Sequence, residues 1–153
     1  MAKSLNVEII TPSKLFYMGE AELVVVKTLT GDEGFMAGHT WAVKLLDIGE
    51  LCIQEKGKSL DEMKVAAIHG GFIDVQENII IYTDAAEWRE DIDMERAKSL
   101  KESAQAFLEA HKQSTYPYEN QQKDTEEILR ARMELQKAIN RMKVASGGRR
   151  GVR

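Results

Sequence analysis

The chain changes its hydrophobic period once, near Asp84, and this change constrains its architecture more than any other feature. Before Asp84, short apolar or alternating runs are separated by turn signals roughly every 8–12 residues, as in β-sandwiches and barrels. After it, no glycine occurs between Gly71 and Gly147, and apolar residues recur at intervals of three and four. That interval is the period of an amphipathic helix. We therefore expect an all-β sandwich or barrel as N-terminal domain, followed by a C-terminal antiparallel two-helix hairpin.

The expected β domain covers residues 1–87 and consists of short strands with turns between them. Pro12 presets the backbone angle of one turn, and glycines occupy most of the others. At His69, the two following glycines are typical of a strand edge or bulge where crowding is relieved. The predicted strands are 5–9, 22–29, 41–46, 51–54, 64–68, 72–75 and 79–83, and the predicted glycine-containing breaks are 31–34, 47–49, 55–58 and 70–71.

The expected helical hairpin covers residues 88–153, with helices at 91–112 and 124–145. Asp91 is the predicted N-cap of the first helix, and Asp124 with Glu127 has the spacing of a capping box for the second. The predicted apolar seams are Met94, Ala97, Leu100, Ala104, Phe107 and Leu108 on the first helix, and Ile128, Ala131, Leu135, Ile139, Met142 and Ala145 on the second. Two narrow seams give little core, so the hairpin must lean on the β domain or on another protein. It could detach and dock again.

Composition narrows the class of protein further. The 153 residues contain no apolar run near the roughly 20 that a membrane span needs. The single cysteine, Cys52, forms no internal disulfide and is expected to be a buried small hydrophobe. Trp41 and Trp88 are expected to be packing or interface residues.

Charge is distributed unevenly along the chain. Residues 1–87 carry a net charge of −7, residues 88–153 carry +3, and the last part, residues 128–153, carries +7. A basic end on an acidic body indicates an interaction with an acidic partner. Nucleic acid is not the expected partner, because the front domain is acidic and aromatic residues do not alternate with the basic ones.

Three stretches, in this order, carry a resemblance to a known family. Residues 31–39 read GDEGFMAGH, similar to a G-E-x-G-x-x-P-G-H loop, with Ala37 in the place of the proline. Residues 70–78 read GGFIDVQEN, similar to G-G-F-x-x-V-x-x-N. Residues 86–87 followed by 90–97 read AE and EDIDMERA, similar to an A-E…E-D-I-D-x-x-R-A junction. This ordered set resembles the epsilon subunits of F-type ATP synthases of bacterial or plastid type. The polar loop at 113–123 and the tail beyond Ala145 depart from it.

The resemblance implies a noncatalytic central-stalk (rotor) subunit that couples ion translocation to ATP synthesis and inhibits ATP hydrolysis through its hairpin. The implied partners are the gamma subunit, the c-ring and the catalytic beta subunits. No cofactor or metal is required, and ATP is implied as a regulatory ligand. Membrane association is expected only through the complex. The absence of a leader-like segment in the sequence favours the cytoplasmic face of a bacterial membrane, and a plastid thylakoid fits equally.

The resemblance also implies two sets of site residues, one in the β domain and one shared by the domain junction and both helices. Asp32 and His39 lie in the expected rotor-interface loop; the alternative is ordinary turn chemistry. The tentative regulatory nucleotide-binding residues are Glu87, Ile92, Asp93, Arg96, Ala97 and Arg141. The alternative is a helix start with acids in its first turn and an intrahelical ion pair. Ser103 and Lys137 stand where ATP-binding relatives carry arginine.

The basic second helix is the expected inhibitory element. Its residues are Arg130, Arg132, Lys137, Arg141 and Lys143. In the family this helix approaches an acidic segment of the catalytic beta subunit; the alternative is a solvated helix face.

Two other classes of function compete with this interpretation. One is a stand-alone ATP-sensing binding module. The other is a small hydrolase on a β scaffold, which lacks support because the chain has neither a G-x-S-x-G elbow nor a P-loop. His39, His69 and His111 lie in different expected elements, without zinc-ligand spacing.

Overall fold

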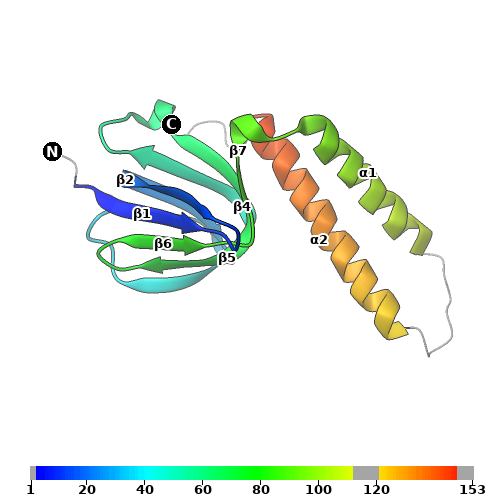
Figure 1. Ribbon diagram of the computed structural model, residues 1–153. Helices are drawn as coiled ribbons and strands as arrows, with labels where there is room; N and C mark the ends of the chain where they lie inside the picture. Colours follow the sequence, from blue (N-terminus) through cyan, green and yellow to red (C-terminus); the bar gives the residue numbers. More distant parts are fainter. Residues whose placement is uncertain (1–2, 112–120, 148–153) are drawn as a thin grey trace.

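The front part of the chain forms a closed β-sheet, and a helical hairpin lies at its side (Figure 1). This computed structural model describes residues 3–111 and 121–147, with side chains left out at 121–125. The strands are β1 (Leu5–Ile10), β2 (Leu15–Thr28), β3 (Gly31–Phe35), β4 (Ala42–Glu55), β5 (Lys64–Val75), β6 (Ile79–Tyr82) and β7 (Ala86–Trp88). The helical elements are the 3-10 turns η1 (Leu60–Glu62) and η2 (Arg89–Asp91) and the helices α1 (Met94–His111) and α2 (Gln121–Ala145).

The sheet closes because β1 pairs along both of its edges. It runs antiparallel to β2 and parallel to β6, so the order β1-β6-β5-β4-β2 returns to β1. β3 adds to the second half of β2, and β7 adds to β5. Closure removes the free edges along which sheets aggregate. The predicted all-β sandwich or barrel followed by a two-helix hairpin is confirmed.

One apolar core fills the inside of the sheet. In β1 the inward residues alternate with polar ones, as expected for a strand with one buried face. The fully or nearly fully buried core residues include Leu5, Val7, Ile9, Val24, Val26, Phe35, Leu46, Leu51, Ile53, Ile68, Ile73, Val75, Ile79 and Ile81. This core makes the β domain the rigid body to which the hairpin is attached.

Two predicted turns, at 47–49 and 70–71, are wrong, because β4 and β5 run through them as one long hairpin. Their register is unbroken from Ala42 opposite Val75 to Ile53 opposite Lys64. Gly70 and Gly71 have positive φ angles of 83° and 108°, which side chains rarely adopt. A Cβ at Gly71 would collide with the carbonyl oxygen of Tyr82. The glycines thus allow a local change in the face of the strand without a turn, and the pairings of β5 show no register shift of the kind that a bulge would produce.

The break predicted at 31–34 is also wrong, because these residues belong to β3. Val24 to Thr28 of β2 pair with Phe35 to Gly31. The Thr28 hydroxyl donates a hydrogen bond to the Gly31 carbonyl at 2.8 Å and so closes the tight connection between the strands. A side-chain bond of this kind stabilises a turn over few residues.

Helix α1 begins three residues after the predicted start. Asp93, not Asp91, acts as its cap: the Arg96 amide donates to Asp93 Oδ1 at 3.1 Å, and the Ala97 amide donates to the Asp93 carbonyl. Asp91 lies in η2 instead. Ala97 and Ala104 are the buried residues of α1, whereas Leu100 of the predicted seam is 39% exposed.

Helix α2 runs antiparallel to α1 and lies between α1 and the sheet (Figure 1). It begins at Gln121, before the predicted capping box at Asp124, whose side chain lies outside the described set. Ile139 of the predicted seam is 44% exposed, and its neighbour Ala138 is buried instead. The loop at 113–123 and the tail beyond Ala145, which depart from the family pattern, also lie mostly outside the described residues.

Candidate functional site

The outer surface of β4 and β5 carries the contact with the hairpin. Its residues pair across the two strands as Cys52 with Val65, Glu50 with Ala67 and Ile48 with His69. Because side chains alternate along a strand, all six share the face opposite to the core. We call these six residues the docking face. Helix α2 packs against β4 and β5, while α1 packs along α2.

The apolar part of this contact is small. Val144 of α2 is completely buried in a cluster with Val25, Cys52, Val65 and Ala67. Cys52 is buried as expected, and its thiol donates to Glu50 Oε1 at 3.2 Å. Burying one valine stabilises by about 1.5–3 kcal/mol. The hairpin is therefore held by little hydrophobic surface.

Polar contacts surround Val144 and hold the end of α2 in one orientation. The Arg141 guanidinium donates to both carboxylate oxygens of Glu87, at 2.9 and 3.1 Å. Arg89 Nε donates at 2.9 Å to the Val144 carbonyl, which also accepts from the Gly147 amide at 3.2 Å in the last turn of the helix. Asn140 Nδ2 donates to the Gly49 carbonyl at 3.0 Å.

His69 lies at the end of the docking face nearest the glycine pair. Burial lowers the pKa of its imidazole, and the positive charges of Lys137 and Arg141 lower it further. The negative charges of Glu134 and Glu87 raise the pKa of His69, but by less than burial and the two cations lower it. The neutral imidazole is thus favoured beneath the docked helix.

The residues of the tentative nucleotide site occupy different positions around the junction. Glu87 and Arg141 come together in an ion pair. Ile92 packs half-buried against the Val144 cluster, and Ala97 is fully buried. Asp93 caps α1 and Arg96 is exposed. The cap formed by Asp93 agrees with the alternative of a helix start, whereas the Glu87–Arg141 pair joins two elements and is not the intrahelical ion pair of that alternative.

The two positions that depart from the ATP-binding pattern lie along the hairpin. Ser103 lines a groove of about 470 Å³ between α1 and α2, together with Phe107 and Arg130. Lys137 is half-buried and pairs with Glu134 at 3.4 Å. Neither supplies the planar donor fork of an arginine.

The predicted basic helix presents its charges on two opposite faces. Arg130, Lys137 and Arg141 recur at intervals of seven and four, so they share one face. Arg132 and Lys143 lie on the other. Arg132 lines a hollow with Leu108 and His111, and Lys143 lines another of about 420 Å³ between α2 and the sheet.

The predicted rotor-interface loop is structured by local contacts. Asp32 is exposed in β3, opposite Lys27 of β2. His39 lies in the following loop, where its Nδ1 donates to the Thr40 carbonyl at 2.6 Å and its ring packs edge-on to Phe35.

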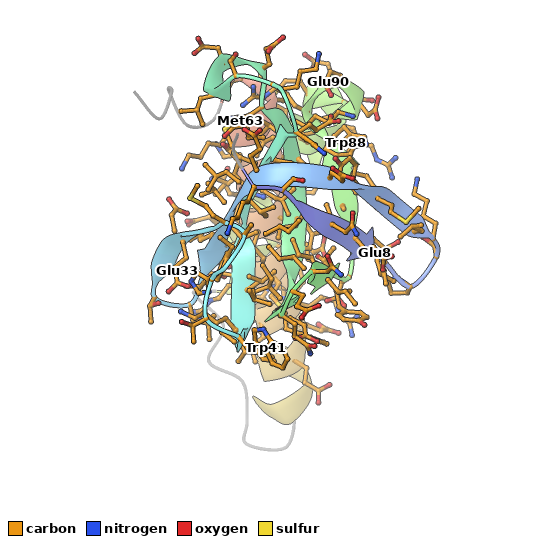
Figure 2. The ribbon with its side chains drawn as sticks, turned by 90° about the vertical axis from the view of Figure 1, so that its left-hand side faces the viewer. Glu8, Glu33, Trp41, Met63, Trp88 and Glu90 are labelled. Carbon is orange, nitrogen blue, oxygen red and sulfur yellow. The ribbon has the colours of Figure 1, made fainter. Side chains whose placement is uncertain are left out.

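The sequence reading missed an apolar patch on the outer sheet. Leu45 of β4, Phe72 of β5 and Tyr82 of β6 are direct neighbours across the strands, and the two rings stack at 4.7 Å. With the nearby exposed Trp41 and Val43, they form what we call the apolar patch. Figure 2 shows Trp41 at the end of the β domain opposite to Met63 and Trp88. The run at 41–46 predicts a strand, and its pairing partners were needed to identify the exposed face.

Trp88, at the other end, is a packing residue as expected. It stacks on Phe16 at 4.5 Å and meets Tyr17 edge-on, and Lys64 lies over the Trp88 and Tyr17 rings. The described residues contain no cluster of metal-ligating side chains. They also include no helix long and apolar enough to cross a membrane.

Comparisons with known proteins agree with this architecture. Residues 4–89 match the family described as ATP synthase, Delta/Epsilon chain, beta-sandwich domain, and residues 90–146 match its long alpha-helix domain. The ATP synthase epsilon chain of Caldicellulosiruptor saccharolyticus is 34% identical over 147 residues, which cover 95% of this chain and 96% of the relative. The ATP synthase epsilon chain of Alkaliphilus metalliredigens is 44% identical over 110 residues, covering 71% of this chain and 79% of the relative.

A solved structure shares the fold. A chain in the mitochondrial ATP synthase of Euglena gracilis, in its OSCP/F1/c-ring assembly, superposes with a TM-score of 0.70 at 21% identity. The match covers 90% of this chain and 78% of the other.

Proposed function

The chain belongs to the epsilon-chain family of ATP synthases, and on that premise we propose that its hairpin is a detachable arm that regulates the rotor. The epsilon chain is a noncatalytic subunit of the synthase. Its contribution therefore lies in coupling and control. In this proposal the β domain is the body fixed to the central stalk, and the hairpin inhibits ATP hydrolysis when it leaves the docking face.

The composition of the docking contact supports a reversible arm. Val144 contributes about 1.5–3 kcal/mol of apolar burial. The ion pair between Arg141 and Glu87, which joins α2 to β7, adds about 1 kcal/mol or more. A net docking free energy of a few kcal/mol lets a competing surface shift the population between two states.

The apolar patch supports attachment of the β domain to other subunits. A contiguous exposed group of Trp41, Val43, Leu45, Phe72 and Tyr82 is typical of a protein–protein contact. We assign this patch to the gamma subunit, and the neighbouring loop with Asp32 and His39 to the c-ring. The subunit then lies at the membrane surface through the complex, at the cytoplasmic face in a bacterium.

Undocking would release the basic charges of α2. In the docked state, Arg141 is held by Glu87 and cannot reach another subunit. Once α2 is free, the face with Arg130, Lys137 and Arg141 presents three cations to the acidic segment of a catalytic beta subunit. Several ion pairs together are needed, because each one alone is weak.

We also propose ATP as the regulatory ligand of the docked state. Arg96 and Arg141 are the cations that would hold its phosphates, with Glu87 and Asp93 as acceptors for sugar or base. Ile92 and Ala97 would supply packing at the junction. At the two positions where ATP-binding relatives carry arginine, Lys137 retains the positive charge and Ser103 does not.

Two variants with opposite expected effects test the regulatory arm in a reconstituted synthase. Deleting the residues after Asp91 removes the arm, so ATP hydrolysis should rise while assembly is retained. Val144→Asp buries a charge in the docking contact, so it should free the intact arm and lower hydrolysis. Ser146→Asp, an exposed neighbour, is the matched control. Unchanged hydrolysis in the truncated complex would contradict the proposal.

A further inference from the structure

His69 is the titratable ring of the docking face. It follows Val65 and Ala67 on the same side of β5 and pairs across the sheet with Ile48. Its backbone amide is fixed by a 3.2 Å hydrogen bond to the Ala85 carbonyl, and Gly70 and Gly71 follow at once. The side chain is half-buried below α2. The ring therefore lies on the face of the sheet that α2 covers while the hairpin is docked.

The charged groups that surround this ring come from every element packed on it. Helix α2 contributes Glu134, Lys137 and Arg141, β7 contributes Glu87, and β4 contributes Glu50 next to Ile48 in the same face. The two cations lower the pKa of His69 after burial itself, and the carboxylates Glu134 and Glu87 raise it less.

The carboxylates have little attraction left for a protonated ring. Glu87 is engaged by both donors of Arg141, and Glu134 is paired with Lys137. Glu50 accepts the Cys52 thiol within a buried setting. An imidazolium at this place would therefore lose water and gain mainly repulsion from α2.

We propose that His69 makes the docking of the hairpin sensitive to protons: the neutral ring permits the docked state, and its protonation releases α2 from the sheet. This inference rests on the reversible arm proposed above. Because the docked state disfavours the proton, docking is unaffected well above the ordinary histidine pKa of about 6.5 and weakens as the pH falls below it. The ratio of undocked to docked hairpin should rise by up to about tenfold per pH unit there, the limit for one proton.

The other two histidines serve as internal controls. His39 lies in the loop before β4, outside the docking face, and bonds to Thr40. His111 lies at the end of α1, where it stacks on Phe107 and bonds to the Phe107 carbonyl. Three ring signals, assigned by single substitutions, can thus be followed separately by NMR in the full-length chain.

The experiment combines ring titration with a distance measurement from pH 5 to 8. Labels at Glu77→Cys in the β domain and Lys98→Cys on α1 report docking by fluorescence transfer. Because Cys52 belongs to the docking face, the Cys52→Ala background is shared by all labelled variants, and its His69 titration is first compared with that of the unaltered chain. Acidification should separate the labels, and the His69 signal should titrate below the ordinary range. His69→Gln should abolish the pH response, and His111→Gln should preserve it.

A charge variant distinguishes the cause. Lys137→Gln removes one cation facing His69, so it should raise the pKa of His69 and reduce the effect of acidification. Lys143→Gln removes one positive charge from the other face of the same helix, so it should change neither the pKa of His69 nor the effect of acidification. An ordinary His69 titration, pH-independent docking, or a response retained in His69→Gln would overturn the inference.

The same data separate this inference from the reversible arm itself. If truncation relieves inhibition but the label distance does not respond to pH, only the role of His69 fails. If truncation also leaves hydrolysis unchanged, the arm fails as well.

Discussion

Arg141 and Glu87, 54 positions apart in the sequence, form a two-pronged ion pair that joins the last turns of α2 to β7. Their side chains are only 14% and 28% exposed. Solvent and salt screen such a pair less than a surface pair such as Lys56–Glu20, whose side chains are 59% and 49% exposed. The pair also fixes the orientation of α2 relative to β7, because a guanidinium and a carboxylate bind through two bonds only when they lie in one plane.

The first prediction concerns this ion pair. Arg141→Gln should shift the hairpin toward the undocked state, because Glu87 then remains half-buried without its cation. In a double-mutant cycle with Glu87→Gln, the coupling energy should be about 1 kcal/mol or more. The Glu77–Lys98 label distance at pH 8 measures the docked fraction. Lys56→Gln, which breaks a pair on the β domain, should leave it unchanged, and additivity of the two substitutions would contradict a coupled pair.

The second prediction concerns the apolar contact. Val144→Ala removes two fully buried methyl groups, so docking should weaken by roughly 1–2.5 kcal/mol. Ile139→Ala on the same helix removes a larger but 44% exposed side chain and should change docking by less than about 0.5 kcal/mol. Equal effects of the two substitutions would show that Val144 does not hold the helix.

The third prediction concerns the glycine pair in β5. Gly71→Ala should lower the free energy of unfolding of the β domain by more than about 2 kcal/mol, because the new Cβ meets the Tyr82 backbone at a positive φ. Gly57→Ala also has a positive φ but meets no atom within 4 Å, so its effect should be near 1 kcal/mol. Urea unfolding followed by tryptophan fluorescence provides both values.

The glycine pair also shows where sequence reasoning reaches its limit. The periods of two and of three to four residues predicted the kinds of elements and their order, because they reflect which faces are buried. Glycine permits positive φ both in a turn and in a strand that changes face, so Gly70 and Gly71 alone could not tell the two apart. Only the pairing of β4 with β5 on both sides of the glycines shows that the strand continues through them.

The contacts of the candidate site residues could not be predicted from the sequence, and their role in binding a nucleotide stays a prediction. Glu87 and Arg141 were both expected from the resemblance, but their ion pair depends on how α2 crosses the sheet. The cap of α1 shows the same limit. The aspartates at 91 and 93 are both suitable N-caps, but Asp91 belongs to η2, so Asp93 caps the helix. For His69 the sequence predicts only a strand edge or a bulge, whereas its position under α2 arises from the tertiary fold.

The fourth prediction concerns the apolar patch. Leu45→Asp replaces a 61% exposed side chain, so the isolated chain should keep its unfolding temperature. Its incorporation into the synthase should fall strongly, since the charge would have to be buried against a partner. Leu15→Asp, at a 52% exposed position of β2 outside the patch, is the control. Assembly is measured by pull-down with the gamma subunit. If Leu45→Asp assembles normally, the apolar patch is not part of the rotor interface.

The fifth prediction concerns ATP. If Arg96 and Arg141 hold phosphate, calorimetry should detect millimolar or tighter binding to the full chain, and Arg96→Ala should weaken it at least about tenfold through loss of a charged hydrogen bond. Lys98→Ala, two residues further along α1, should bind normally. Because the ligand would favour the docked state, ATP should also shorten the Glu77–Lys98 label distance in Arg141-containing chains. An absence of binding by the unaltered chain would leave Asp93 as a helix cap and Arg141 as the partner of Glu87, with the position of the hairpin then set by protein contacts alone.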